Sequence, residues 1–596
     1  MPARIVEREI DEATLAATQL LKLHPIAERV LAGRASKYGI DPGTILNCTL
    51  RDLDSPATLP DIGVGSERIV RAIKDGEVIG LETDHDVDGV TSHAVLYRAL
   101  ADYFGHPKSK IRSYIGHRLE EGYGLSQKLC DRILSDDIRP TLIVTADNGS
   151  SDAQRITILR QNGIDTVVTD HHGMPEEGPP ADAIACISPA RPDSAFADPL
   201  IAGVMVSFLL MCVVRLRLIE DGFLKPDSPR LSGLLDYVAL GTVADCVSLV
   251  RSRNNRAVIR AGLGPISSGA RPCWRAIRPF LGDQAKPVTT SDLAYGIGPR
   301  INAVGRLDDA MVGVRFLLSE TDEEANRWAA ELNTGNELRK EIEAELKDEA
   351  VMVGELQVEC ERTVLQVCLT DGHAGVHGIV ASRLVERFGR PSVCFSAKQG
   401  EPGILVGSAR GVEGMHIRDA MQRTEDLSPG LLVRFGGHAG AGGLTIREEN
   451  FPLFERTFES VVSAQIAGKV LEPLTITDGT VSTRDVTEGM LEAFQQLEPF
   501  GREFEAPLLV GRFKMMSAKP MGASKQHWRF KLIGLEGGVF EAVWFNAGET
   551  CPISMSGLYR LAFSPELNWW NGRAKMQLLV RAAEPETEVL DNAYAI

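Results

Sequence analysis

Residues 78–92, VIGLETDHDVDGVTS, run from a short apolar stretch into a dense group of carboxylates. Residues 78–81 have the composition of a buried strand, and Asp84, Asp86 and Asp88 follow them at alternate positions. Three carboxylates so close in the chain repel one another, so a fold that retains them needs a counter-charge nearby. The stretch therefore predicts a strand that ends at a site holding positive charge.

Strand-like and helical stretches alternate on both sides of this point. We expect further strands at 141–145, 165–169 and 183–187, and helices at 92–104, 126–135 and 151–161. Such alternation is typical of an α/β domain with a doubly wound parallel sheet, whose strands are apolar throughout because both faces are covered.

Polar side chains also follow the later strands of this predicted sheet. Asp147 follows TLIVTA, Asp170, His171 and His172 follow DTVVT, and Asp245 ends an apolar segment. Ligands bind at the carboxyl ends of parallel strands, so we expect these groups at one edge. Carboxylates with imidazoles suit Mn²⁺, Mg²⁺, Fe²⁺ or Zn²⁺. Two such ions about 3.5–4 Å apart can activate water and stabilise the attacking and leaving oxygens of an in-line displacement at phosphorus.

Each motif alone has a simpler explanation. An Asp after a strand is often a helix N-cap or turn residue, and this explains Asp147 equally well. A lone pair of histidines lies more often on the surface or in the core than at a metal. The DxDxDG stretch could form a calcium loop, but position 95 is Val where an EF-hand requires Glu. The occurrence of these residues at four segment ends favours the metal site.

The composition excludes several classes of protein. The 596 residues have a net charge of -17, which argues against coating nucleic acid or anionic membranes, although a local basic groove remains open. Ten scattered cysteines without a CxxC pair indicate neither a zinc ribbon nor a disulfide framework. The N-terminus does not resemble a signal peptide, and the longest apolar run, 200–214, is a buried helix too short to span a bilayer. We expect a cytoplasmic protein with no membrane partner.

The strand–helix alternation defines one domain of a larger chain. We expect a long, charged helix over 321–350 that bridges two domains, then a second, smaller α/β domain and a C-terminal β-barrel. The predicted division is an N-terminal extension at 1–65, the catalytic domain at 66–265, a helical connector at 266–350, the second α/β domain at 351–468 and the barrel at 469–596.

The barrel region has the opposite charge to the whole chain. Residues 511–582 contain ten basic and four acidic side chains. Proteins that bind single strands combine a basic groove with aromatic side chains on which bases stack. We assign one or two of the five local aromatics to stacking and the rest to the barrel core: Trp528, Trp544, Phe545, Trp569 and Trp570.

The motifs resemble those of a known superfamily. DHDVDG (84–89), TADNGSS (145–151), VVTDHHG (167–173) and LGTVADC (240–246) are similar to the four motifs of the DHH phosphoesterases. Later motifs resemble the RecJ family of bacterial single-stranded-DNA-specific exonucleases: HRLEEGYGLS (117–126), GPRINAVGRLDDA (298–310), DGHAGVHGIVASRLVERFGRP (371–391), GSARGVEGMHIRDA (407–420), FGGHAGAGGLTI (435–446) and LEPFGREFEAP (497–507). The resemblance covers residues 65–582 and implies a DHH domain, a DHHA1 domain and an oligonucleotide-binding (OB-like) barrel.

The resemblance also implies roles for individual residues. Two divalent cations, Mn²⁺ or Mg²⁺, would be held with Asp147 as the bridge by Asp86, Asp88, Asp147, His171 and Asp245. Asp84 and Asp170 would support these ligands, and His172 would contact the scissile phosphate or assist proton transfer. Arg300 would contact the scissile-phosphate region. The 5′-phosphate and the strand would be bound by Arg118, Ser408, Arg410, Gly437 and His438, the last two in the GGH motif.

The implied activity is two-metal hydrolysis of single-stranded DNA in the 5′→3′ direction, releasing 5′-mononucleotides in DNA repair and recombination. A narrow passage between the two α/β domains would exclude duplex DNA. Single-strand-binding protein and a RecQ-type helicase would be partners.

Two other functions remain as alternatives. A DHH phosphodiesterase for cyclic dinucleotides or very short oligonucleotides would typically lack the barrel and GPRINAVGR. A replication scaffold of the same fold would have lost the ligands that this chain retains.

Some residues depart from the RecJ pattern or have a second explanation. His85 stands where Tyr or Phe is usual, Gly440 and Gly442 stand in a usual Met-Ala-Ala, and Ser248 replaces a usual Pro. Arg306 could equally pair with surface carboxylates. We interpret the chain as an active but divergent member.

Overall fold

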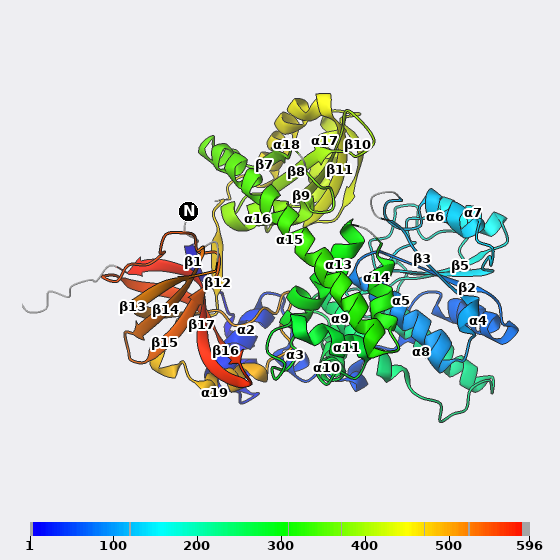
Figure 1. The fold of residues 1–596 in the computed structure, drawn as a ribbon, viewed down its shortest axis with the longest axis horizontal. Helices are drawn as coiled ribbons and strands as arrows, with labels where there is room; N and C mark the ends of the chain where they lie inside the picture. The colour runs from blue at the N-terminus through cyan, green and yellow to red at the C-terminus, as the bar shows by residue number, and fades with distance from the viewer. Residues whose placement is uncertain are drawn as a thin grey trace, which may run out of the picture.

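The computed structural model describes residues 4–117, 121–307, 309–370, 372–469, 471–522 and 525–586. They form three lobes (Figure 1): a first α/β lobe, a second α/β lobe and a barrel lobe that also holds the N-terminal segment. Among these residues, no helix combines the length and the apolar character that crossing a membrane requires.

The first lobe is built on a fully parallel sheet with strand order β3-β2-β4-β5-β6. The strands are β2 (Ile79–Thr83), β3 (Ile111–Ile115), β4 (Leu142–Ala146), β5 (Asp165–Thr169) and β6 (Ala185–Ile187). One face packs on α4 (Ile62–Asp75), α5 (Val87–Arg98) and α8 (Gly203–Glu220), and the other on α6 (Gln127–Leu134) and α7 (Ala153–Gln161). The predicted doubly wound sheet is confirmed.

Two details of this lobe differ from the sequence prediction. The strand β3 was not predicted, although it forms an edge of the sheet beside β2. The first helix begins at Val87 rather than at residue 92, because the Asp86 side chain caps it and accepts hydrogen bonds from the amides of Asp88 and Gly89. The acidic stretch is therefore part of the helix start.

A run of helices connects the two α/β lobes. They are α9 (Leu235–Ala244), α10 (Arg253–Ser267), α11 (Pro272–Ile277), α12 (Thr290–Asp292), α13 (Gly298–Leu307), α14 (Met311–Leu318) and α15 (Asp322–Glu359). The helix α15 has 38 residues and extends from the first lobe into the second (Figure 1). Its Ala325 and Leu332 belong to the core of the first lobe, whereas Leu346 and Ala350 belong to the core of the second. The predicted bridging helix is confirmed and is longer than expected.

The second lobe contains a five-stranded mixed sheet of order β10-β11-β9-β8-β7. Its strands are β7 (Leu365–Cys368), β8 (Ser392–Ala397), β9 (Ile404–Arg410), β10 (Leu432–Gly437) and β11 (Ala441–Arg447). Only β7 and β8 pair in parallel. The helices are α16 (His377–Phe388), α17 (Ile417–Leu427) and α18 (Phe451–Gln465).

The C-terminal strands close into a five-stranded barrel of order β13-β14-β15-β17-β16. They are β13 (Leu509–Met521), β14 (His527–Gly534), β15 (Val539–Trp544), β16 (Leu558–Trp570) and β17 (Arg573–Glu586), preceded by α19 (Glu488–Gln495). The N-terminal strand β1 (Arg4–Glu7) pairs with β12 (Leu474–Thr477). The other N-terminal elements, as expected, are short helices: α1 (Glu12–Gln19), α2 (Pro25–Ser36) and α3 (Pro42–Leu46).

Candidate metal and nucleic-acid site

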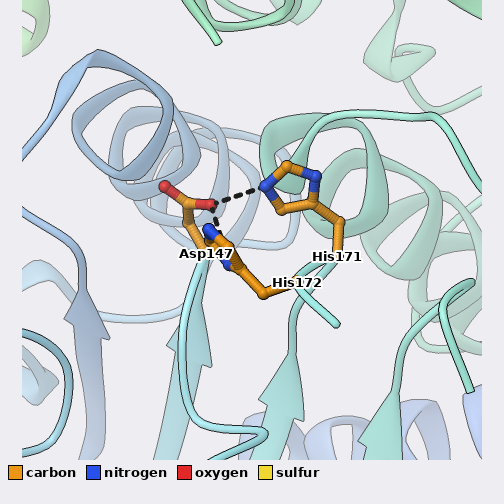
Figure 2. Close-up of side chains that lie close together, drawn as sticks. All are labelled: Asp147, His171 and His172. Atoms are coloured by element: carbon orange, nitrogen blue, oxygen red, sulfur yellow. Dashed lines mark ion pairs between the residues drawn. The ribbon is translucent and has the colours of Figure 1, made fainter. Parts of the chain in front are cut away.

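Asp147, His171 and His172 meet at the carboxyl ends of two neighbouring strands (Figure 2). Asp147 follows β4 directly, and the histidines follow β5. The Oδ1 atom of Asp147 lies 3.1 Å from His171 Nε2 and 3.9 Å from His172 Nδ1. Asp147 has a left-handed backbone conformation with φ of 64°, which turns its side chain back over the sheet edge.

Asp88 is held at the same edge by a different element. Its two carboxylate oxygens accept hydrogen bonds from the amides of Gly203 and Val204, at 2.7 and 2.9 Å. These amides start α8, which has no side-chain cap, so Asp88 supplies the acceptor that the helix end lacks. Gly203 also leaves room for Asp147, because a Cβ at position 203 would lie 2.8 Å from Asp147 Oδ1.

Asp245 completes the cluster from the end of α9. His171 Nε2 lies 3.6 Å from Asp245 Oδ2 and 3.8 Å from Asp88 Oδ2. Three overlapping groups have potential ligand atoms within 4.8 Å of one another: Asp84, Asp86 and Asp147; Asp88, His171 and Asp245; and Asp147, His171 and His172. The structure thus brings together all five residues predicted as metal ligands.

The electrostatics of the cluster call for a cation. Burial and the neighbouring charge of Asp86 raise the pKa of Asp88 to about 7, and burial with adjacent carboxylates raises the pKa of Asp147 well above its usual value. Burial lowers the pKa of His171 to about 4, so the imidazole is neutral and able to bind a metal. Asp147 Oδ1 and His171 Nε2 are buried without a hydrogen-bond partner among the described residues. This donor set fits two divalent cations.

Asp170 positions both histidines. Its Oδ1 accepts hydrogen bonds from the amides of His171 and His172 and lies 2.8 Å from His172 Nδ1, while Oδ2 accepts from the Ser150 amide. Burial opposes a charge on His172, but the contact with Asp170 outweighs it and raises the pKa of His172 to about 9. The His172 side chain is 46% exposed and that of His171 only 12%, so His172 is the histidine that a substrate can reach.

Tyr123 and His85 also contact this site, although the sequence analysis gave them no role. The Tyr123 hydroxyl donates a hydrogen bond to the Asp147 carbonyl at 3.2 Å, and its ring meets the His172 ring edge-on. His85 Nδ1 lies 2.8 Å from Asp84 Oδ1, and its ring meets Tyr123 edge-on. The Gly-Tyr-Gly turn within HRLEEGYGLS was the signal available for Tyr123.

The predicted phosphate-binding residues of the second lobe lie on neighbouring strands of its sheet. Ser408 and Arg410 lie two residues apart on β9, and Gly437 and His438 lie at the turn that joins β10 to β11. Gly437 has a φ of 142°, and a Cβ there would lie 2.4 Å from the Ala441 carbonyl oxygen. Burial is the main cause of the lowered pKa of His438, and the charges of Arg410 and of His172 in the first lobe also lower it.

The remaining predicted arginines have other surroundings. Arg118 lies outside the described residues. Arg300 is buried, donates hydrogen bonds to Asn333 Oδ1 and the Gly296 carbonyl, and packs against the Phe280 ring. Arg306 donates to the Gly375 carbonyl of the second lobe at 2.9 Å, so it joins the two α/β lobes.

The barrel aromatics differ in exposure. Phe545 and Trp570 are exposed, at 48% and 76%. Trp528 and Trp544 pack against the barrel core, and Trp569 is partly buried. The two exposed rings are the candidates for base stacking.

The sheet edge, its carboxylate–histidine cluster and the second lobe together define a member of the DHH phosphoesterase superfamily. Models of the DHH family N-terminal domain, the DHHA1 domain and the RecJ OB domain match residues 78–242, 361–464 and 477–582. The chain is 35% identical over 574 residues to the single-stranded-DNA-specific exonuclease RecJ of Haemophilus influenzae, covering 95% of this chain and 97% of the relative. It is 37% identical to the protein of that name from Dickeya dadantii, covering 91% and 93%. The chain belongs to the RecJ family.

Solved structures agree with this assignment. RecJ from Thermus thermophilus with Mn²⁺ has the same fold, with a TM-score of 0.74 and 23% identity over 98% of this chain and 80% of that one. A second structure of exonuclease RecJ bound to manganese has a TM-score of 0.54 and 30% identity, over 69% of this chain and 98% of that chain.

Proposed function

We propose that this chain is a metal-dependent exonuclease that digests single-stranded DNA from the 5′ end and releases 5′-mononucleotides. The observation that supports this most directly is the cluster of Asp88, Asp147, His171 and Asp245, whose crowded carboxylates suit divalent cations. The curated relatives of this family are named single-stranded-DNA-specific exonucleases. The barrel and the GPRINAVGR segment disfavour a phosphodiesterase for very small substrates.

We assign the two cations, Mn²⁺ or Mg²⁺, to five residues that would hold them: Asp86, Asp88, Asp147, His171 and Asp245. Such ions supply Lewis-acid activation of water and of the scissile phosphate. The chain's own groups fix the geometry: the α8 amides orient Asp88, and Asp170 orients His171 and His172. Holding ligands in this way reduces the reorganisation that the reaction requires.

The remaining residues of the first lobe would act on the substrate. His172 is the exposed histidine of the pair and would contact the scissile phosphate or assist proton transfer. Asp84 would support the ligands from beside Asp86. Arg300 would act near the scissile phosphate if its side chain left the Asn333 contact on substrate binding.

Binding of the strand end would use the second lobe. Ser408, Arg410, Gly437 and His438, together with Arg118, would hold the 5′-phosphate, because guanidinium, hydroxyl and imidazole groups donate hydrogen bonds to phosphate oxygens. The lobes would correspond to a DHH domain at 66–265, a helical connector at 266–350, a DHHA1 domain at 351–468 and an OB-like domain at 469–596. A narrow passage between the α/β lobes would exclude duplex DNA.

In the cell we place the enzyme in the cytoplasm, in DNA repair and recombination, where single-strand-binding protein and a RecQ-type helicase would supply single strands. The ten cysteines are all free, which suits a reducing compartment.

The 5′-phosphate tests this assignment. Wild-type enzyme should digest a 5′-phosphorylated single strand faster than a 5′-hydroxyl strand, and Arg410→Gln should remove most of that difference because it removes the cation. Arg456→Gln, at an exposed arginine of α18, is the matched control and should retain the preference. Rates come from 5′- and 3′-labelled strands with Mn²⁺ or Mg²⁺. Equal preference in wild type and Arg410→Gln would refute the pocket, and release from the 3′ end would refute the polarity.

A further inference from the structure

The loop between α19 and the barrel brings one arginine, Arg502, beside the segment that follows the proposed metal ligand Asp245. Its backbone is attached to the segment that follows Asp245: the Leu249 amide donates to the Arg502 carbonyl at 3.0 Å. The next residue, Glu503, accepts two hydrogen bonds from Arg251, at 2.7 and 3.0 Å, and one from Ser248. The position of Arg502 is therefore fixed relative to the first lobe.

The preceding part of the loop is held equally firmly. Arg256 on α10 is buried and donates hydrogen bonds to the carbonyls of Leu497 and Pro499, at 2.7 and 3.0 Å. Arg260, one turn later, donates twice to the Glu498 carbonyl, at 2.9 and 3.0 Å. Together these are eight hydrogen bonds to backbone carbonyl and carboxylate oxygens of residues 497–503. A surface loop normally has fewer such contacts and moves more freely.

The side chain of Arg502 is available for a ligand. It is exposed, and no hydrogen bond or ion pair of its guanidinium group occurs among the residues that the structure describes. The adjacent carboxylate of Glu503 is already occupied by Arg251 and Ser248. An arginine with no partner on a rigid loop is suited to bind an external anion.

The charge of Arg502 also reaches the second lobe. Burial is the main cause of the lowered pKa of His438, and the charges of Arg410, His172, His416 and Arg502 contribute. Of these charges that of Arg410 contributes most and that of Arg502 least, as expected if Arg502 lies farther from the GGH turn than Arg410 does. Arg502 belongs to the loop before the barrel, whereas Arg410 lies on β9.

We propose that Arg502 binds a backbone phosphate of the DNA strand on the 3′ side of the scissile bond, where the strand leaves the cleft towards the barrel. This inference rests on the proposed exonuclease function. The terminal phosphate is assigned to Arg410 and the opposite lobe, so a cation on the barrel side meets the part of the strand that has not yet been digested. A guanidinium group can bind two oxygens of one phosphate and need not contact a base, which suits digestion without sequence preference.

The test compares Arg502→Gln with Arg456→Gln, since both replace an exposed arginine without a partner among the described residues. Single-turnover digestion of a 5′-phosphorylated 20-mer would be measured at several salt concentrations with Mn²⁺. Arg502→Gln should raise the half-saturating DNA concentration about five-fold, as expected for one lost charged contact. The slope of log affinity against log salt should fall in magnitude by about 0.7, because one phosphate contact to a single strand is lost.

A minimal substrate separates this role from a structural one. The dinucleotide with a 5′-phosphate has no phosphate beyond the scissile bond, so Arg502→Gln should cleave it at the wild-type rate. Loss of dinucleotide cleavage, or an unchanged affinity and salt slope on the 20-mer, would refute the inference. If wild type and Arg456→Gln do not digest the 20-mer from the 5′ end, the proposed function itself fails, and this result is distinct from either outcome for Arg502.

Discussion

At the scale of single residues, the site contains groups that destabilise the folded chain when no ligand is bound. Asp147 is buried, has a left-handed backbone and has an oxygen with no hydrogen-bond partner among the described residues. Each of these features destabilises an isolated carboxylate. Together they favour our proposal that Asp147 binds a metal over the turn-residue explanation, which was equally good from the sequence.

Asp147→Asn tests this argument, because Asn also tolerates the left-handed conformation. We expect a loss of nuclease activity larger than the roughly 10–100-fold that substitutions of ligand-supporting groups cause. Wild type should also gain about 2.7 kcal/mol of stability at Mn²⁺ concentrations 100 times Kd, seen as a rise in Tm, and the variant should lose most of it. Asp75→Asn, at the exposed end of α4, is the control. An active variant with the full Mn²⁺ shift would contradict the assignment.

At the scale of helices and strands, the sequence predicted those elements whose own residue pattern is distinctive. The strand β5 has the predicted bounds, and the apolar run at 200–214 lies largely in α8. The strand β3 was missed because IRSYI mixes polar and apolar residues, as a sheet-edge strand does. Nor could the sequence show that the start of α8 binds Asp88, since the partners lie 115 residues apart. The residues that we propose as ligands could be selected from the sequence, but the contacts that orient them depend on the tertiary fold.

The helix α5 contains a buried group that should make stability depend on pH. His93 contacts Thr83 Oγ1 and Ser113 Oγ on β2 and β3, and burial lowers its pKa to about 3. Below pH 6.5 the unfolded chain binds a proton at this histidine and the folded chain does not. Its contribution to stability is therefore complete above pH 6.5 and is lost by up to about 1.4 kcal/mol per unit as the pH falls towards 3.

His93→Gln should remove this dependence while retaining a side chain that can form hydrogen bonds. Urea unfolding between pH 7.5 and 5 should show that the variant loses less stability than wild type over this range. His24→Gln, at an exposed histidine, is the control. Parallel loss of stability in wild type and His93→Gln would show that His93 is not the group responsible.

At the scale of the whole molecule, the barrel lobe is not a detachable module. One apolar core contains barrel residues such as Phe513 and Leu561 together with Val30 and Leu31 of α2 and Ile259 of α10. Arg34 of α2 also forms a buried ion pair with Asp478, which follows β12. Deleting the chain from about residue 475 would expose this core and disturb the first lobe. Substitutions at the joint, meaning the contact between the barrel lobe and the first lobe, therefore test the role of the barrel better than truncation does.

Arg256 is the residue at this joint whose loss should be most informative. It is buried on α10 and donates hydrogen bonds to three carbonyls, those of Ile45, Leu497 and Pro499. Arg256→Met keeps the length of the side chain but leaves these acceptors without a donor, which should cost about 1–3 kcal/mol for each group that water cannot reach. Because the lost contacts join the first lobe to the loop before the barrel, the barrel should separate from the first lobe before either unfolds completely.

Limited proteolysis combined with urea unfolding would detect that separation. In Arg256→Met, cleavage near residues 497–504 should occur at a urea concentration at which the first lobe is still folded, whereas wild type should resist cleavage until the main transition. Arg51→Met, at an exposed arginine, should behave as wild type. The same variant should weaken DNA binding through displacement of Arg502 while the metal-dependent Tm shift persists, because the ligands lie on other elements. If Arg256→Met unfolds in a single transition at the same urea midpoint as wild type, Arg256 does not couple the barrel lobe to the first lobe.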